Sequence, residues 1–236
     1  MNGVEAIVLA VTVFAAAFVQ GSTGLGFALL VAPVVGFFEP ALLPVMLLLL
    51  MIPLNTYVAW RERSSLDRFG AGWITAGRVG GTVGGLWVLA VIPSERLGLL
   101  IGVSTVVAAS AALFGPSFRP GKPAFVVAGV VTGITETSTG IGGPPLALVY
   151  QHRSGPVLRS TVALCFLVGE VFSVLVLLAG GRVQVAQLQA ALLLAPALVL
   201  GAVASRWMHR RVDGPVLRGF VLAFALISGV VVMLRG

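Results

Sequence analysis

Gln20-Gly21-Ser22-Thr23-Gly24-Leu25-Gly26 interrupts a run of 35 residues, Val4 to Phe38, that is otherwise almost wholly apolar. A single helix over this run would be roughly 52 Å long at about 1.5 Å per residue, whereas the hydrocarbon core of a bilayer is ~30 Å thick. The chain must therefore tilt strongly or fold back at the break. Lipid tolerates an opened backbone only where it faces protein or a wet cavity, which makes the break a candidate site.

A second break of the same kind, Glu136-Thr137-Ser138-Thr139-Gly140-Ile141-Gly142-Gly143-Pro144-Pro145, lies in the apolar block 124–150. Residues 22–26 match residues 138–142 at an offset of 116, and weaker matches follow in order at an offset of 120. This order indicates an internal duplication. Paired breaks in corresponding halves are typical of the substrate site of a secondary transporter.

The composition indicates a polytopic α-helical membrane protein. Hydrophobic residues make up 58% of the chain and charged residues 10%, and the mean hydropathy is +1.07, whereas soluble domains carry about 25% charged residues. The apolar residues run in blocks and do not alternate, which argues against a membrane β-barrel. The net charge of +7 sits in short loops, where basic residues set membrane orientation, so it does not indicate a nucleic-acid partner.

The apolar blocks predict an all-α fold of two repeats, each a broken, re-entrant helical hairpin followed by three transmembrane helices. The first repeat, 1–114, comprises hairpin 4–38 and spans 40–60, 70–92 and 96–114; residues 115–123 form a linker; and the second repeat, 124–236, comprises hairpin 124–150 and spans 156–179, 184–205 and 214–234. Because three spans is an odd number, the second repeat is inverted relative to the first.

Positive charge supports the re-entrant form of the second hairpin. If block 124–150 crossed the membrane, seven of the Lys and Arg residues outside the spans would lie on one side of the membrane and six on the other. If the block is a re-entrant hairpin, ten lie on one side and three on the other, which is a clear positive-inside pattern. The ten are Arg61, Arg63, Arg68, Arg119, Lys122, Arg153, Arg159, Arg206, Arg210 and Arg211, and the three are Arg96, Arg182 and Arg235. This topology places both termini outside the cytoplasm.

The breaks have the chemistry of an anion site. Each second limb starts at a Gly-rich break, where backbone N–H groups lack partners and the helix dipole is positive, so these amides and nearby hydroxyls are expected to hold a small anion. The alternative is that Gly, Ser and Thr only allow close helix packing. The residues expected to bind the anion are Ser22, Thr23, Gly24, Gly26, Ser138, Thr139, Gly140, Gly142, Gly143, Arg78 and Asn55.

Isolated polar residues within the apolar blocks are the remaining candidates. Glu136 precedes the second break, and an intramembrane carboxylate is a functional candidate by default; it either carries a coupling proton or only caps nearby N–H groups. Arg78 either reaches the anion through its planar fork or snorkels to the cytoplasmic surface, and we favour snorkelling. Asn55 lines a cavity or bonds between helices. Glu170 is expected to pair with an arginine of another span.

These residues carry a resemblance to a known family. Thr132 to Pro145 resembles the second-half motif of the sulfite exporter TauE/SafE family, also called the 4-toluene sulfonate uptake permeases, and Gly21 to Phe27 resembles its first-half motif. The resemblance implies a multi-pass permease of the bacterial inner membrane for sulfur-containing anions, such as sulfite, sulfoacetate, or taurine-derived or aryl sulfonates. It implies the class of solute rather than one anion.

We therefore expect a secondary transporter that works by alternating access, with its substrate between the breaks near mid-membrane. The alternatives are an anion channel of the same fold, a membrane-embedded enzyme or a non-transporting scaffold. With two His and one Cys, all apart in sequence, the chain offers no cluster for a soft metal, and neither a metal nor a cofactor is expected. The expected partners are a small anion and the lipid bilayer, and a homo-oligomer is compatible with the sequence.

Overall fold

The computed structural model describes residues 3–114, 120–208 and 214–235, and these ranges are helical and contain no strand. Their α-helices are α1 (Gly3–Thr23), α2 (Phe27–Phe38), α3 (Val45–Arg61), α4 (Arg68–Val91), α5 (Leu97–Phe114), α6 (Lys122–Thr139), α7 (Gly143–Tyr150), α8 (Gly155–Ala179), α9 (Val185–Met208) and α10 (Gly214–Arg235). The predicted all-α fold is confirmed. Part of the predicted linker 115–123, with Arg119, and the basic residues Arg210 and Arg211 lie outside the described residues.

Five helices are long and apolar enough to cross a membrane, counted over the described residues. They are α1, α4, α5, α8 and residues Val185–Trp207 of α9. The helices α2, α3 and most of α10 are apolar but shorter. Large apolar side chains such as Val4, Leu192 and Phe220 are mostly exposed on the outside of the bundle, as expected of residues that face lipid. The chain is a polytopic membrane protein.

Both broken blocks fold back at their Gly-rich segments. Gly24, Gly26 and Gly140 have φ values of 88°, 116° and 83°, a left-handed conformation that glycine adopts without steric cost. As a result α1 packs on α2 and α6 packs on α7. The limbs of each hairpin are unequal: α1 has 21 residues and α2 has 12, while α6 has 18 and α7 has 8.

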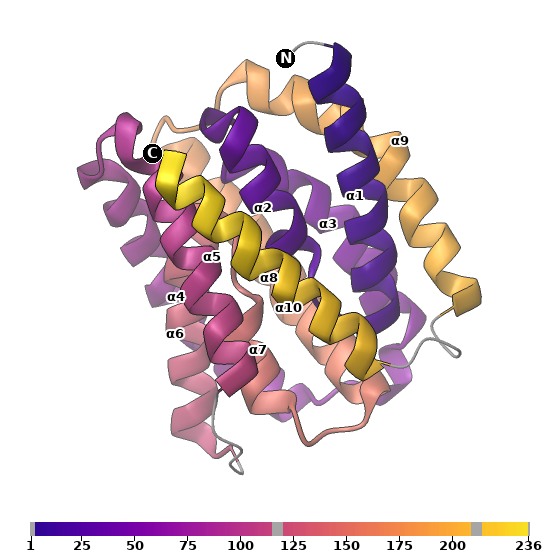
Figure 1. The fold of residues 1–236 in the computed structure, drawn as a ribbon. Coiled ribbons are helices and arrows are strands. Elements are labelled where there is room, and N and C mark those ends of the chain that lie inside the picture. Colours follow the sequence, from indigo (N-terminus) through magenta and orange to yellow (C-terminus); the bar gives the residue numbers. More distant parts are fainter. Residues whose placement is uncertain (1–2, 115–119, 209–213, 236) are drawn as a thin grey trace.

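The helix pairings follow a regular pattern. The pairs α1–α9 and α4–α6 are in close contact, as are α3–α8 and α5–α10. If the helices of the first half, α1 to α5, are matched in order with those of the second half, α6 to α10, then α1 corresponds to α6 and α9 to α4. The pair α1–α9 therefore corresponds to the pair α6–α4, and the pairs α3–α8 and α5–α10 each correspond to themselves. Figure 1 shows α1 beside α9 and both chain termini toward the same end of the bundle. The inverted repeat itself stays a prediction that these pairings favour.

Glycines bring α4 and α6 into backbone contact. A Cβ atom at Gly77 or Gly81 would overlap the carbonyl oxygens of Val126 or Val130, and one at Gly85 would lie 2.7 Å from the carbonyl oxygen of Ile134. The spacing of four residues places these glycines on one face of α4, a small-residue interface typical of membrane helices. Gly80, on another face, has open space around it. This contact sets the positions of the polar side chains that α4 and α6 carry.

Candidate functional site

Arg78 and Glu136 form an ion pair in the interior of the protein. Arg78 lies on α4 and Glu136 on α6, with exposed fractions of 1% and 0%, and Arg78 Nη2 pairs with Glu136 Oε2. The expectation that Arg78 snorkels was wrong, because the glycine contact between α4 and α6 leaves the guanidinium facing a carboxylate inside the bundle.

A chain of hydrogen bonds leads from the first break to a second buried carboxyl. The N–H of Phe27 donates to Gln20 Oε1 at 3.0 Å, and Gln20 Nε2 donates to Asn55 Oδ1 at 2.8 Å. Asn55 Nδ2 in turn donates to Glu170 Oε1 at 2.6 Å. Asn55 therefore bonds between helices. We call the five side chains that share this interior the buried polar network: Gln20, Asn55, Arg78, Glu136 and Glu170.

Residues of α8 close around the guanidinium of Arg78. Its Cζ lies 5.8 Å from the centre of the Phe166 ring, and a Cβ at Gly169 would overlap the guanidinium. Glu170 faces Arg78 electrostatically, although its hydrogen bond goes to Asn55. Arg78 therefore pairs with a carboxylate of α6 and interacts electrostatically with a carboxyl group of α8.

A cavity of about 780 Å³ lies next to the buried polar network. The first break contributes Ser22, Thr23 and Gly26 to its wall, and the second contributes Gly143 and Pro144. The remaining lining residues are Val19, Gln20, Leu25, Ala28, Leu29, Met51, Ala112, Leu113, Ala147, Gln151, Arg153, Gly155, Leu158, Arg159, Phe166, Gly219, Val221 and Leu222. Because Arg153 and Gly155 are exposed, the cavity opens at the end of the bundle where α8 begins.

The positive ends of two helices meet at this cavity. A Cβ at Gly143, the first residue of α7, would lie 3.4 Å from Leu25 Cδ2, so the two breaks are in contact. At the start of α2, the N–H of Phe27 is taken by Gln20. Ala28 and Leu29 also line the cavity. Their N–H groups belong to the first turn of α2 and have no acceptor within the helix. The cavity wall therefore carries amides that favour an anion.

Arg159 is a cavity residue whose role the sequence did not reveal. It lies near the start of α8, and its Nε donates to both carboxylate oxygens of Glu62, at 2.8 and 2.9 Å. A Cβ at Gly24 would lie 2.6 Å from Arg159 Cγ, so the glycine of the first break makes room for this side chain. Arg61 supports the same break, because its Nη2 donates to the carbonyl oxygen of Gly21 at 2.6 Å. The predicted topology placed basic residues at the end of the bundle where α8 begins, but it assigned none of them to the cavity.

Some of the predicted site residues line the cavity, some belong to the buried polar network, and the others do neither. Those that line the cavity are Ser22, Thr23, Gly26 and Gly143; those in the network are Asn55, Arg78 and Glu136; and those that do neither are Gly24, Ser138, Thr139, Gly140 and Gly142. All four predicted hydroxyls already donate to backbone carbonyls of their own helix, as Ser22 does to Phe18 at 2.8 Å and Ser138 to Ile134 at 2.8 Å. They must rotate before they can donate to a ligand.

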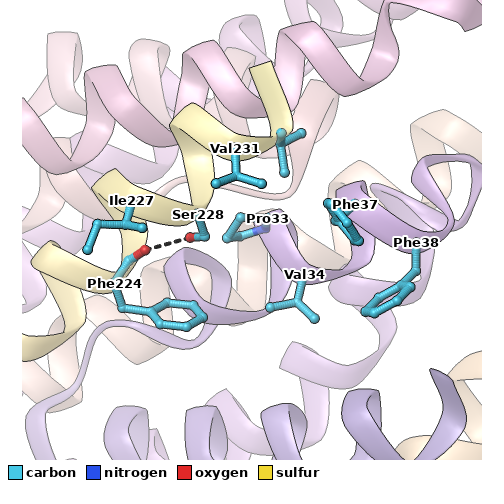
Figure 2. A pocket seen from close by; sticks show the side chains of 9 residues that line it. Pro33, Val34, Phe37, Phe38, Phe224, Ile227, Ser228 and Val231 are labelled. Carbon is cyan, nitrogen blue, oxygen red and sulfur yellow. Dashed lines mark hydrogen bonds between the residues drawn. The ribbon is translucent and has the colours of Figure 1, made fainter. Parts of the chain in front are cut away.

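A second pocket, of about 340 Å³, lies between α2 and α10 (Figure 2). Its walls are apolar except for Ser228, whose hydroxyl donates to the carbonyl oxygen of Phe224 at 2.6 Å. Ile227 at its edge is 69% exposed, so the pocket lies on the outer surface of the bundle. It offers no free donor to an anion. Over the described ranges, no group of three or more His, Cys, Asp and Glu side chains is placed to hold a metal ion.

Comparison with known proteins identifies a family. The family model described as Sulfite exporter TauE/SafE matches residues 9–232, nearly the whole chain. No curated protein and no solved structure matches. The match spans both breaks, the cavity and the buried polar network.

Proposed function

We propose that this chain, which belongs to the sulfite exporter TauE/SafE family, is a secondary transporter that carries a small sulfur-containing anion through the cavity between its two breaks. The observation that carries the proposal is that both breaks contribute to one cavity of about 780 Å³. Small-molecule sites have volumes of roughly 300–1,000 Å³. The family is one of membrane transporters, which the apolar helices of this chain fit.

The cavity offers positive charge from two sources. The first turn of α2 presents backbone amides, and the start of α7 presents the N–H of Gly143, because Pro144 and Pro145 have none. Arg153 and Arg159 line the same cavity. A sulfite or sulfonate group has three oxygens, which match the bidentate fork of an arginine guanidinium. The first break would hold the anion through Ala28, Leu29 and rotated hydroxyls, and the second through the amide of Gly143.

The cavity would face the cytoplasm. It opens beside Arg153, in a loop that the positive-inside rule assigns to that side, in a bacterial inner membrane with both termini outside. Alternating access then requires movement of the repeats until the breaks face the other side. The exchange symmetry of the helix pairings supports this architecture.

The direct test is flux through proteoliposomes that contain the purified protein. A carrier for sulfite or methanesulfonate saturates with concentration and exchanges labelled anion on one side for unlabelled anion on the other. A channel follows the membrane voltage and does neither. Failure of both anions to cross, in vesicles whose protein is folded, would contradict the proposal.

Arg159→Gln and Glu62→Gln are expected to change anion binding in opposite directions. Arg159→Gln removes a charged donor from the cavity, and loss of a charge-assisted hydrogen bond of about 1.5–3 kcal/mol weakens binding about ten- to hundred-fold. Glu62→Gln removes the carboxylate that competes with the anion for Arg159 Nε, so binding becomes several-fold tighter. The measurement is the rise in melting temperature with sulfite or methanesulfonate, which reports binding to the folded state.

Arg63→Gln is the matched control, because it makes the same charge change on an exposed side chain that does not line the cavity. It is expected to leave binding unchanged. If Glu62→Gln weakened binding as much as Arg159→Gln, the Arg159–Glu62 pair would be a structural ion pair and the anion would bind elsewhere.

A further inference from the structure

The buried polar network contains one more acidic group than basic group. Glu136 and Glu170 are both 0% exposed and share one guanidinium, that of Arg78, which is 1% exposed. Glu170 faces Arg78 on α4 and the neutral amide of Asn55 on α3. Arg78 in turn faces Glu136 on α6 and the thiol of Cys165 on α8. With both carboxylates ionised, the network would hold a net negative charge away from water.

Such a charge is costly. Removing an ion from water costs several kcal/mol unless a partner neutralises it, and Arg78 can neutralise only one of the two carboxylates. One bound proton makes the network electrically neutral.

The ion pair indicates which carboxyl group holds that proton. Glu136 Oε2 is paired with Arg78, so the positive charge of the guanidinium favours the ionised form of Glu136. Glu170 Oε1 accepts a hydrogen bond from the neutral amide of Asn55 instead. Within the described residues, Glu170 Oε2 and both oxygens of Glu136 have no hydrogen-bond partner. We infer that the buried polar network is the binding site of a coupling proton, shared between the two carboxyl groups and carried by Glu170 in this conformation. The sequence alone had pointed to Glu136.

Two residues connect this proton to the cavity, and this step rests on the proposed function. Gln20 lines the cavity and is bonded through Asn55 to Glu170. Phe166 also lines the cavity, and its ring centre lies 5.8 Å from Arg78 Cζ. A deprotonated network repels an anion in the cavity and a protonated one does not. Proton and anion therefore bind cooperatively, each favouring the other by the same free energy, and the transporter moves them together.

Infrared spectroscopy of the purified protein tests the proton without any anion. The wild type at neutral pH should show the carbonyl stretch of one protonated, buried carboxylic acid, which shifts in D₂O. Glu170→Gln should abolish this band. Glu136→Gln should abolish it as well, because Arg78 then balances Glu170 alone. Glu39→Gln, which removes an exposed carboxylate, is the matched control and should leave the band unchanged.

A wild type without the band, or a band that persists in Glu170→Gln, would overturn the inference. A band that persists in Glu136→Gln would show that charge balance does not place the proton, and would overturn the shared site. Retention of the wild-type melting temperature by Glu170→Gln is expected, since glutamine mimics the neutral acid and keeps the bond to Asn55.

Proteoliposomes test the coupling separately. A proton gradient should accelerate methanesulfonate flux by the wild type, whereas Glu170→Gln and Glu136→Gln should keep exchange and lose the response to the gradient. An unaltered response in both variants would remove the network from coupling. If the wild type carried neither sulfite nor methanesulfonate, the proposed substrate would be wrong, while the infrared result would still decide the proton site.

Discussion

Arg78→Gln is expected to lower the free energy of unfolding by about 3–5 kcal/mol, the usual cost of removing one partner from a buried ion pair. The substitution leaves two buried carboxyl groups, Glu136 and Glu170, facing a neutral amide. It also removes the guanidinium that fills the space beside Gly169 and Phe166.

The double variant Arg78→Gln with Glu136→Gln should recover most of this loss, because the excess charge disappears. Arg78→Gln combined with Glu62→Gln is the matched control and should recover none of it, since Glu62 bonds to Arg159 at another place in the bundle. A double-mutant cycle of this kind isolates the interaction between the two residues.

The single cysteine provides the measurement. Cys165 is 0% exposed on α8, and the chain has no other thiol. A maleimide dye should therefore react with the protein in detergent only as it unfolds, and the midpoint of the reaction on heating compares the variants. Equal midpoints for the wild type and Arg78→Gln would contradict the buried ion pair.

Gly81→Ala is expected to destabilise the protein by about 1–3 kcal/mol, the range found for overpacked cores. The added Cβ would overlap the carbonyl oxygen of Val130 on α6. Because backbone cannot give way as a flexible side chain does, α4 and α6 must separate. Their separation would also pull Arg78 from Glu136, so transport should fall together with stability.

Gly80→Ala is the control from the adjacent residue of the same helix. A Cβ at Gly80 meets nothing within 4 Å, and alanine favours helix by about 1 kcal/mol over glycine. Its melting temperature, followed by the Cys165 reaction, should equal or slightly exceed that of the wild type. A similar loss in both variants would show that α4 depends on its glycines for a reason other than contact with α6.

The breaks could be predicted from the sequence because they are local. An apolar run of 35 residues is too long for one crossing, and its single glycine-rich segment is the place where the chain can reverse. The positive φ values of Gly24, Gly26 and Gly140 agree with this reasoning. The hydroxyl groups near the breaks were harder to interpret, since Ser22 and Ser138 can donate either to a ligand or to their own helix.

The partners of the buried polar residues could not be predicted. Glu136 and Arg78 were each identified as candidates, but their distance along the chain gives no sign that they pair. Arg159 looked like one more basic residue at a helix end, and only the packing of Gly24 against it places it in the cavity.

The sequence by itself determined the class of protein, the helices and the two places where the chain folds back, because hydrophobic length and glycine content act on each segment separately. Only the tertiary structure decided which side chains meet: two acids around one arginine, and a second arginine beside the first break. The physical reason is that the rotation and depth of each helix follow from packing against its neighbours. The glycine contact between α4 and α6 sets the position of Arg78 relative to Glu136.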